Sequence, residues 1–400
     1  MIDWYSRYSE YDLNLVKAYL KNRYEKKEVM PQINIVYDIL HQCDIHCRGC
    51  GTNAIYCEDI HLNVDKPSIK EIEKILLRIK DYADKEKRPV FLNFGGGEPF
   101  LRDDMLQILM IASAMFSIEN IGVDTNGTLI DSYELLNKAA EYCGYIGISI
   151  NGLRDYSAWW AGNSKIDVYE RQMALVSRLC LDETINNKIE VTSVATKKNI
   201  QELPILLDNL SMCGVKKYSV HRSIPVGRMK NISALIPSSR EYFELMIELV
   251  KRTNGKDIEC HLHHSIESIH TSLLLGFDTY KYDRIGNPDI RSSIGIEPNG
   301  EVVFDPWCTT DEWKMLTAGN ILNTNVSLID MINSTDAVFT RVKQKINKKS
   351  RCHGCTHDCS GGSRMVAAIC ELESKSVSNL NMDEIIDAMC SVDPGCPLYE

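Results

Sequence analysis

Residues 33–50 read INIVYDILHQCDIHCRGC, a short β-branched run followed by a loop with three cysteines. The run Ile33–Asp38 predicts a strand, because β-branched residues suit a pleated, half-buried surface. Cys43, Cys47 and Cys50 then follow with the spacing C-x3-C-x2-C. A strand that leads directly into closely spaced cysteines indicates both the start of a sheet and a metal-binding loop.

Similar runs recur downstream and alternate with stretches of helical periodicity. Further strands are predicted at residues 90–94, 121–124, 146–150, 190–195 and 217–220. Helices are predicted between them at residues 68–86, 102–115, 132–142, 167–181 and 200–213. Each helix returns the chain to the same end of the sheet, so the strands are expected to be parallel. The predicted fold class is therefore α/β, with a partial (β/α)6 barrel of the TIM type.

Polar and glycine-rich segments follow the predicted strands. After the cysteine loop they are Gly95-Gly96-Gly97-Glu98-Pro99, Thr125-Asn126-Gly127, Ser149-Ile150-Asn151-Gly152 and, after the sixth strand, Arg222 with Pro225-Val226-Gly227-Arg228. Barrel enzymes place their active sites at the carboxyl ends of the strands, because the loops converge there. We therefore expect these segments to form one active site.

The chain has 400 residues, of which 44% are hydrophobic, and a formal net charge of -10. These values are typical of a globular protein and exclude a disordered or fibrous one. No basic run predicts nucleic-acid binding, no secretory signal opens the chain, and the longest apolar stretch, residues 105–118, is too short to cross a bilayer. We expect a cytoplasmic protein with no nucleic-acid or membrane partner. Cytosolic thiols stay reduced, so metal is the first explanation for clustered cysteines.

Four regions are predicted. Residues 1–30 form an N-terminal helical extension, residues 31–230 the partial barrel, and residues 231–290 a helical bridge. Residues 291–400 form a loop-rich C-terminal domain that holds seven of the 15 cysteines. We expect this last region to depend on a metal, because its apolar burial alone is too small to stabilise it.

The cysteine loop at residues 43–50 is a poor zinc site, because structural zinc takes four protein ligands. Three thiolates instead suit a [4Fe-4S] cluster with one iron left open. With Gly96-Gly97-Glu98-Pro99 after the second strand, the C-x3-C-x2-C spacing resembles the radical S-adenosylmethionine (SAM) superfamily. The resemblance implies that the open iron binds SAM. It also implies reductive cleavage of SAM to methionine and a 5'-deoxyadenosyl radical, which abstracts hydrogen from a substrate.

The resemblance also implies contacts with SAM from several segments: Gly96, Gly97, Glu98, Thr125, Asn126, Ser149, Asn151 and Arg171. The glycines and Glu98 are expected to receive the SAM amino group, and Arg171 the SAM carboxylate. Each segment also has a structural interpretation. The glycine segment and Thr125-Asn126-Gly127 would serve as turns, and Arg171 as a solvated charge.

The C-terminal sequence Cys352-x2-Cys355-x3-Cys359-Ser360-Gly361-Gly362 resembles the SPASM extension of radical SAM enzymes. The pattern departs from SPASM at Thr324 and Ser363, where that family has cysteines. The resemblance implies at least one auxiliary [4Fe-4S] cluster, held by Cys352, Cys355, Cys359 and Cys396. Cys390 or Cys370 could replace Cys396, and Cys308 could serve a second auxiliary cluster. Four thiolates would also satisfy zinc.

These features lead to one expected activity and two alternatives. The first is a radical SAM oxidoreductase or maturase that modifies a peptide or protein, with a flavodoxin or ferredoxin as reductant. The N-terminal segment is too short for a separate peptide-recognition domain, which leaves recognition to the barrel or a partner. The second is a dehydrogenase or epimerase of a small sugar, alcohol or aminoglycoside-like metabolite. The third is a non-catalytic iron-sulfur or zinc scaffold.

Overall fold

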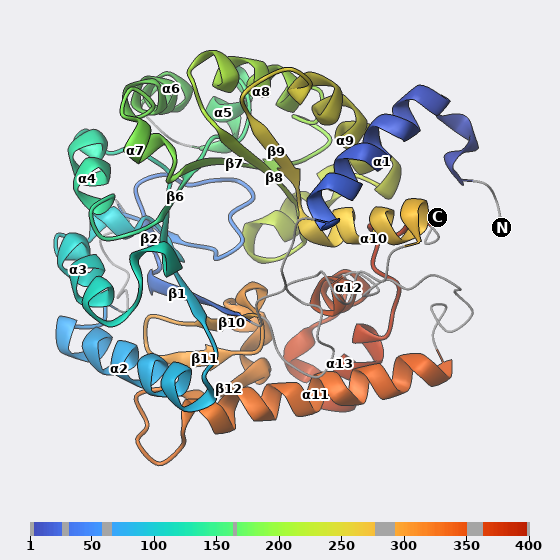
Figure 1. The fold of residues 1–400 in the computed structure, drawn as a ribbon. Coiled ribbons are helices and arrows are strands. Elements are labelled where there is room, and N and C mark those ends of the chain that lie inside the picture. Colours follow the sequence, from blue (N-terminus) through green and yellow to red (C-terminus); the bar gives the residue numbers. More distant parts are fainter. Residues whose placement is uncertain are drawn as a thin grey trace.

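The computed structural model describes residues 4–25, 32–57, 66–162, 166–276, 293–349 and 363–397. Its centre is a ten-stranded sheet in the order β12-β11-β10-β1-β4-β5-β6-β7-β8-β9, with a separate pair β2-β3 (Figure 1). The strands are β1 Ile33–Leu40, β2 Gln42–Cys43, β3 Ile55–Tyr56, β4 Val90–Gly96, β5 Ile121–Thr125, β6 Tyr145–Ser149, β7 Ile189–Ala195, β8 Lys217–Arg222, β9 Glu259–Leu262, β10 Ser293–Ile296, β11 Glu301–Val303 and β12 Thr317–Asn320.

The sheet is parallel from β10 through β1 to β9, and only β11 and β12 pair in antiparallel fashion. All six strands predicted from the sequence are present, and five of the helices between them are at the predicted places. The prediction of an α/β fold with a partial parallel barrel is confirmed.

The helices that the structure describes are α1 Glu10–Glu25, α2 Ile69–Glu86, α3 Met105–Met115, α4 Ser132–Ala139, α5 Arg154–Trp160, α6 Val168–Leu179, α7 Glu183–Asn186, α8 Leu203–Met212, α9 Ser239–Thr253, α10 His264–Leu275, α11 Leu328–Lys349, α12 Arg364–Glu371 and α13 Met382–Met389. Helix α2 begins with a capping box, in which Ser68 accepts from the Glu71 backbone and Glu71 accepts from the Ser68 backbone. No helix among the described residues has the length and apolar character needed to cross a bilayer.

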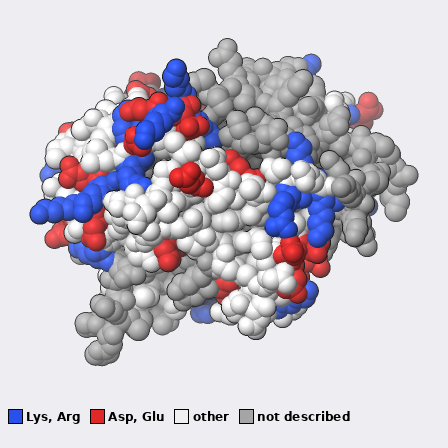
Figure 2. Space-filling view, turned by 90° about the horizontal axis from the view of Figure 1, so that it is seen from below, with Lys and Arg blue, Asp and Glu red and all other residues white. Residues whose placement is uncertain are grey.

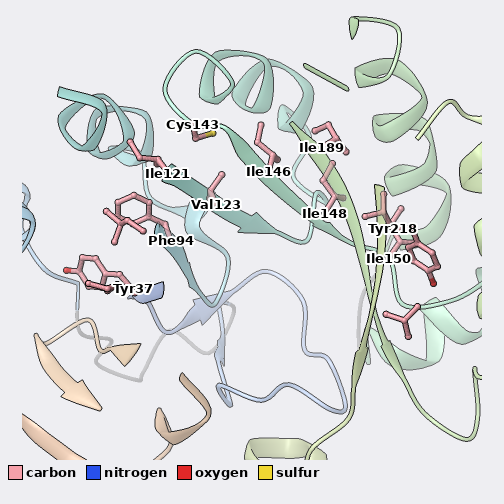
Figure 3. Close-up of a cluster of buried hydrophobic side chains, with 14 of the residues drawn as sticks. Tyr37, Phe94, Ile121, Val123, Cys143, Ile146, Ile148, Ile150, Ile189 and Tyr218 are labelled. Carbon is pink, nitrogen blue, oxygen red and sulfur yellow. The ribbon is translucent and has the colours of Figure 1, made fainter. Parts of the chain in front are cut away.

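Alternating residues of the strands form the main core. Tyr37 of β1, Phe94 of β4, Val123 of β5 and Ile148 of β6 are fully buried beneath the outer helices (Figure 3). Successive side chains of a strand point to opposite faces of the sheet. The residues that alternate with these four along their own strands therefore point into the barrel interior. The sequence pattern thus separates an apolar outer face from an inner face that is free to carry polar groups.

The predicted helical bridge contains an extra strand. Residues Glu259–Leu262 form β9, which extends the parallel sheet beyond β8. Strand β10 likewise pairs with β1, although about 250 residues separate them in the chain. The sheet therefore continues across the predicted boundaries at residues 230 and 290. A four-residue strand carries too little periodicity to be recognised from the sequence.

The C-terminal region is more helical than predicted. Helices α11, α12 and α13 share a second apolar core, in which Val342, Val366, Ile369 and Ile385 are nearly inaccessible. The described part is therefore less loop-rich than predicted, and the dependence of the region on a metal stays a prediction. Residues 350–362, which include Cys352, Cys355 and Cys359, lie outside the described residues.

A buried ion pair joins this C-terminal region to the barrel. Arg222, the last residue of β8, donates to Asp393 at 2.7 Å, and the two side chains are 2% and 0% exposed. The same carboxylate accepts from the backbone N–H groups of Ser363 and Gly395, both at 2.8 Å. One carboxylate therefore holds three segments that are far apart in the sequence.

Candidate functional site

The cysteine loop is fastened by the segment that follows β8. Arg228 donates from its backbone to the Cys50 carbonyl at 2.9 Å, and its guanidinium donates to the carbonyls of Cys47 and Ala54, each at 2.7 Å. Gly227 has a φ of +54°, and a Cβ there would lie 2.5 Å from the Cys50 oxygen. Only glycine suits so close an approach in this conformation. The Pro225–Arg228 segment therefore shapes the cysteine loop.

Two of the three thiols accept from nearby hydrogen-bond donors. Asn126 Nδ2 lies 3.5 Å from Cys43 Sγ, and the Ala54 N–H lies 3.4 Å from Cys50 Sγ. Burial raises the pKa of the Cys47 thiol to about 12, and the Cys50 thiol adds to this shift. A thiolate at this position therefore needs a positive partner such as iron.

The spacing of the thiols also bears on the kind of metal site. Within the described ranges, no three His, Cys, Asp or Glu side chains are arranged to hold one metal ion. In a [4Fe-4S] cluster each thiolate binds a different iron, so its ligands stand farther apart than those of a single ion. The donor chemistry of the loop, three free thiols, is the kind that iron-sulfur clusters take.

The glycine segment after β4 lies against the end of β1. The Gly97 N–H donates to the Leu40 carbonyl at 2.6 Å, and the Glu98 N–H to the Gln42 carbonyl at 2.9 Å. A Cβ on Gly97 would lie 2.0 Å from the Gln42 oxygen, and Gly96 has a φ of +106°. Glycine is thus required at positions 96 and 97 because the backbone just before the cysteine loop passes very close to them.

Glu98 connects the loops that follow β4 and β5. Its carboxylate is 0% exposed and accepts from the Phe100 N–H at 3.1 Å and from Thr125 Oγ1 and the Asn126 N–H, both at 2.8 Å. Burial raises the pKa of Glu98 to about 7, and the nearby Asp44 carboxylate contributes. Asn126 also donates to Asp44 at 2.7 Å. A continuous network therefore runs from Glu98 to the Cys43 thiol.

Helix α6 braces the same loops. Gln172, which is 3% exposed, donates to the carbonyls of Asn126 and Ser149, both at 2.7 Å. Arg171 donates to the Thr128 carbonyl, also at 2.7 Å. Gln172 and Asp44 are not among the residues predicted from the sequence, whereas Arg228 lies in one of the predicted segments. A polar residue in the buried stripe of an amphipathic helix was the available signal for Gln172.

The remaining predicted residues divide into two groups. Ser149 lies in the α6 network, whereas Asn151 accepts from the Val194 N–H at 2.8 Å and so fastens β6 to β7. Of the predicted auxiliary ligands, Cys396 lies among the described residues. Its backbone N–H donates to the Asp393 carbonyl at 2.8 Å, which closes a turn. The structure therefore brings Gly96, Gly97, Glu98, Thr125, Asn126, Ser149 and Arg171 to the sheet edge that carries the cysteine loop.

We expect Gln172→Leu to destabilise the fold by about 1–3 kcal/mol, because it leaves two buried carbonyls without their donor. Urea unfolding measures this change. Gln201→Leu, at an exposed position of the same residue type, is the control and should change stability by less than about 0.5 kcal/mol. Equal stability of the two variants would show that Gln172 does not brace the loops.

Among curated proteins, the chain is similar to the pre-heme d1 synthase of Dinoroseobacter shibae. The two are 23% identical over 357 residues, which cover 84% of this chain and 83% of the relative.

Two solved structures share the fold. Streptococcus suis SuiB bound to the precursor peptide SuiA has a TM-score of 0.63 and 18% identity, and the match covers 91% of this chain and 79% of that one. Native anSMEcpe with bound AdoMet has a TM-score of 0.63 and 17% identity, with coverage of 90% and 96%. The model of the radical SAM superfamily matches residues 37–191, from β1 into β7. With the cysteine loop at the carboxyl edge of a partial barrel, the family match supports the resemblance to the radical SAM superfamily.

Proposed function

We propose that this radical SAM enzyme abstracts a hydrogen atom from a peptide or protein substrate, in a modification of a side chain or backbone. The observation that carries the radical chemistry is the network from Glu98 through Asn126 to Cys43, which fixes the cysteine loop against the carboxyl ends of β4 and β5. Substrates of barrel enzymes bind at this edge.

Cys43, Cys47 and Cys50 would hold the [4Fe-4S] cluster. When bound, the cluster supplies the electron that cleaves SAM to methionine and a 5'-deoxyadenosyl radical. Asn126 and the Ala54 N–H point donors at two of the sulfurs, which stabilises thiolate charge and tunes the reduction potential. Arg228 keeps the loop in one conformation, so the cluster is positioned before SAM binds.

The proposal includes an auxiliary [4Fe-4S] cluster held by Cys352, Cys355, Cys359 and Cys396. Cys390 is less suitable as the fourth ligand, because it is 9% exposed in the second core and its thiol lies 3.7 Å from the Val342 carbonyl. Cys396 follows a turn that Asp393 fixes to the barrel. A flavodoxin or ferredoxin would supply electrons.

A peptide substrate is favoured by the fold match to SuiB, which covers 91% of this chain and was solved with a precursor peptide bound. The second candidate is a small metabolite. It is favoured by the pre-heme d1 synthase relative, whose name indicates synthesis of a small molecule.

The first test is anaerobic reconstitution with iron and sulfide, followed by dithionite and SAM. We expect 5'-deoxyadenosine together with about eight irons per chain, for two cubane clusters. About four irons with 5'-deoxyadenosine would remove the auxiliary cluster from the proposal. Full cluster loading without 5'-deoxyadenosine would indicate a non-catalytic scaffold instead.

A further inference from the structure

Three carboxylates lie on the inner face of the sheet, and a fourth follows β10; we name them the acidic row: Asp38, Asp124, Glu190 and Glu297. Asp38 of β1 is in register with Gly95, and Asp124 of β5 is in register with Gly147, which is in register with Glu190 of β7. Their sequence neighbours Tyr37, Val123 and Ile189 pack under the outer helices. Alternation along each strand therefore directs the carboxylates into the barrel interior.

Glycines make room for these carboxylates. A Cβ on Gly147 would lie 2.0 Å from Asp124 Oδ1, and a Cβ on Gly95 would lie 3.5 Å from Asp38 Oδ1. A larger residue at position 147 would thus occupy the space of the Asp124 side chain. On neighbouring strands, acidic residues therefore lie beside glycines, which have no side chain.

The partners of the acidic row are mostly neutral. Asn93 and Tyr145 donate to Asp124 at 2.6 and 3.3 Å, and Ser219 donates to Glu190. Within the described residues, no Lys or Arg forms an ion pair with Asp38, Asp124 or Glu190. On the molecular surface seen in Figure 2, by contrast, basic and acidic side chains lie beside one another.

The end of the acidic row formed by Asp38 and Glu297 is close to the cysteine loop. His41 Nε2 lies 3.5 Å from Asp38 Oδ2 and 3.2 Å from Glu297 Oε2. Two residues after Asp38, the Leu40 carbonyl accepts from the Gly97 N–H of the site. A molecule bound beside the glycine segment would therefore meet these carboxylates.

One carboxylate oxygen of Asp38 lacks a hydrogen bond although the side chain is almost fully buried, and among the described residues only His41 Nε2 lies near it, at 3.5 Å. Asp38 is 3% exposed, and its Oδ2 atom has no hydrogen-bond partner. Burying a carboxylate oxygen without a donor is costly. Burial raises the pKa of Asp124 to about 6, and the charges of Glu190 and Asp38 add to this shift. The barrel interior thus retains negative charge that a bound cation would compensate.

We propose that the acidic row binds a positively charged group of the substrate, an ammonium or guanidinium, next to the SAM site. This inference rests on the proposed function and specifies its substrate class. A peptide would present a lysine or arginine, and a small metabolite would present an amine. A polycarboxylate substrate would be repelled by the same charges.

The test measures binding to the reconstituted enzyme with SAM and without reductant, so that SAM stays intact. One probe pair is the blocked peptide Gly-Gly-Lys-Gly-Gly and its norleucine analogue, and the other is D-glucosamine and D-glucose. We expect the charged member of at least one pair to bind about tenfold or more tighter, as a charge-assisted hydrogen bond allows. Asp38→Asn should reduce this preference to about twofold or less.

Glu183→Gln is the matched control, because that side chain is 83% exposed and pairs with Lys216 on the surface. It should leave the preference unchanged. Asp38→Asn should be at least as stable as the wild type in thermal unfolding, since it removes like-charge repulsion. A loss of stability together with loss of binding would assign Asp38 a structural role and contradict the proposal.

The remaining outcomes distinguish which molecule supplies the positive charge: SAM, a peptide or a small amine. SAM also carries positive charge, so a tenfold loss of SAM affinity in Asp38→Asn would assign the acidic row to SAM and overturn the substrate proposal. Discrimination of glucosamine but not of the peptides would keep the cationic substrate and refute the peptide. Equal binding within both pairs by the wild type would overturn the inference, even if the enzyme makes 5'-deoxyadenosine.

Discussion

Replacing Cys43, Cys47 and Cys50 together by alanine is expected to remove about four irons per chain and to reduce 5'-deoxyadenosine formation to background. The physical reason is that these three thiols share one short loop, which Arg228 and Asn126 fix at the carboxyl edge of the sheet. Iron analysis and a chromatographic assay of 5'-deoxyadenosine after anaerobic reconstitution measure both effects.

Cys143→Ala serves as the matched control. This thiol is 0% exposed and lies 3.1 Å from the Ala139 carbonyl in the main core, away from the cysteine loop. The variant should lose some stability but keep its iron and its 5'-deoxyadenosine. Persistent SAM cleavage in the triple variant would remove the cysteine loop from the chemistry, whereas retention of about four irons would support the separate auxiliary cluster.

Arg222→Gln is expected to lower the free energy of unfolding by about 3–5 kcal/mol, because it leaves the buried Asp393 charge without its partner. Asp393 is 0% exposed and also accepts from the Ser363 and Gly395 N–H groups. The loss should therefore loosen the C-terminal region as well as the end of β8. Urea unfolding, followed by the tryptophan fluorescence of the barrel and by far-ultraviolet circular dichroism, measures the change.

The exposed ion pair between Arg341 and Asp383 provides the comparison. These side chains are 52% and 73% exposed, and the pair joins α11 to α13. Arg341→Gln should cost at most about 1 kcal/mol, since water already solvates both charges. If Arg222→Gln proves no more destabilising than Arg341→Gln, the buried pair does not hold the C-terminal region to the barrel.

The barrel strands could be predicted because each has a local signature, but their ends depend on neighbours. The second predicted strand stops at Phe94 in the sequence pattern, whereas β4 continues to Gly96 because its last residues pair with the end of β1. Helix α3 begins at Met105 rather than Arg102. Arg102 is buried and donates to the Asp104 carboxylate and the Pro67 carbonyl, which keeps it outside the helix.

In the candidate site, too, local motifs could be predicted and contacts between distant residues could not. The cysteines and the glycine segment could be located from spacing alone, because both are short continuous motifs. The contacts that Gln172, Asp44 and Arg228 make with these loops could not, because they join residues 23 to 181 positions apart. The C-terminal helices were not predicted, because the clustered cysteines indicate a metal as the main source of stability in that region. In the structure, Ile385 and Val366 lie in an apolar core.

The position of β1 between β4 and β10 matters for synthesis of the chain on the ribosome. Strand β1 can pair with β4 early, but its other edge waits for residues 293–296, which are translated much later. Until then the nascent barrel exposes a strand edge with the apolar residues Ile33, Ile35 and Ile39 nearby. Such an edge is a template for pairing with other chains. The last strand to arrive at β1 therefore completes the sheet and also protects the newly made protein from aggregation.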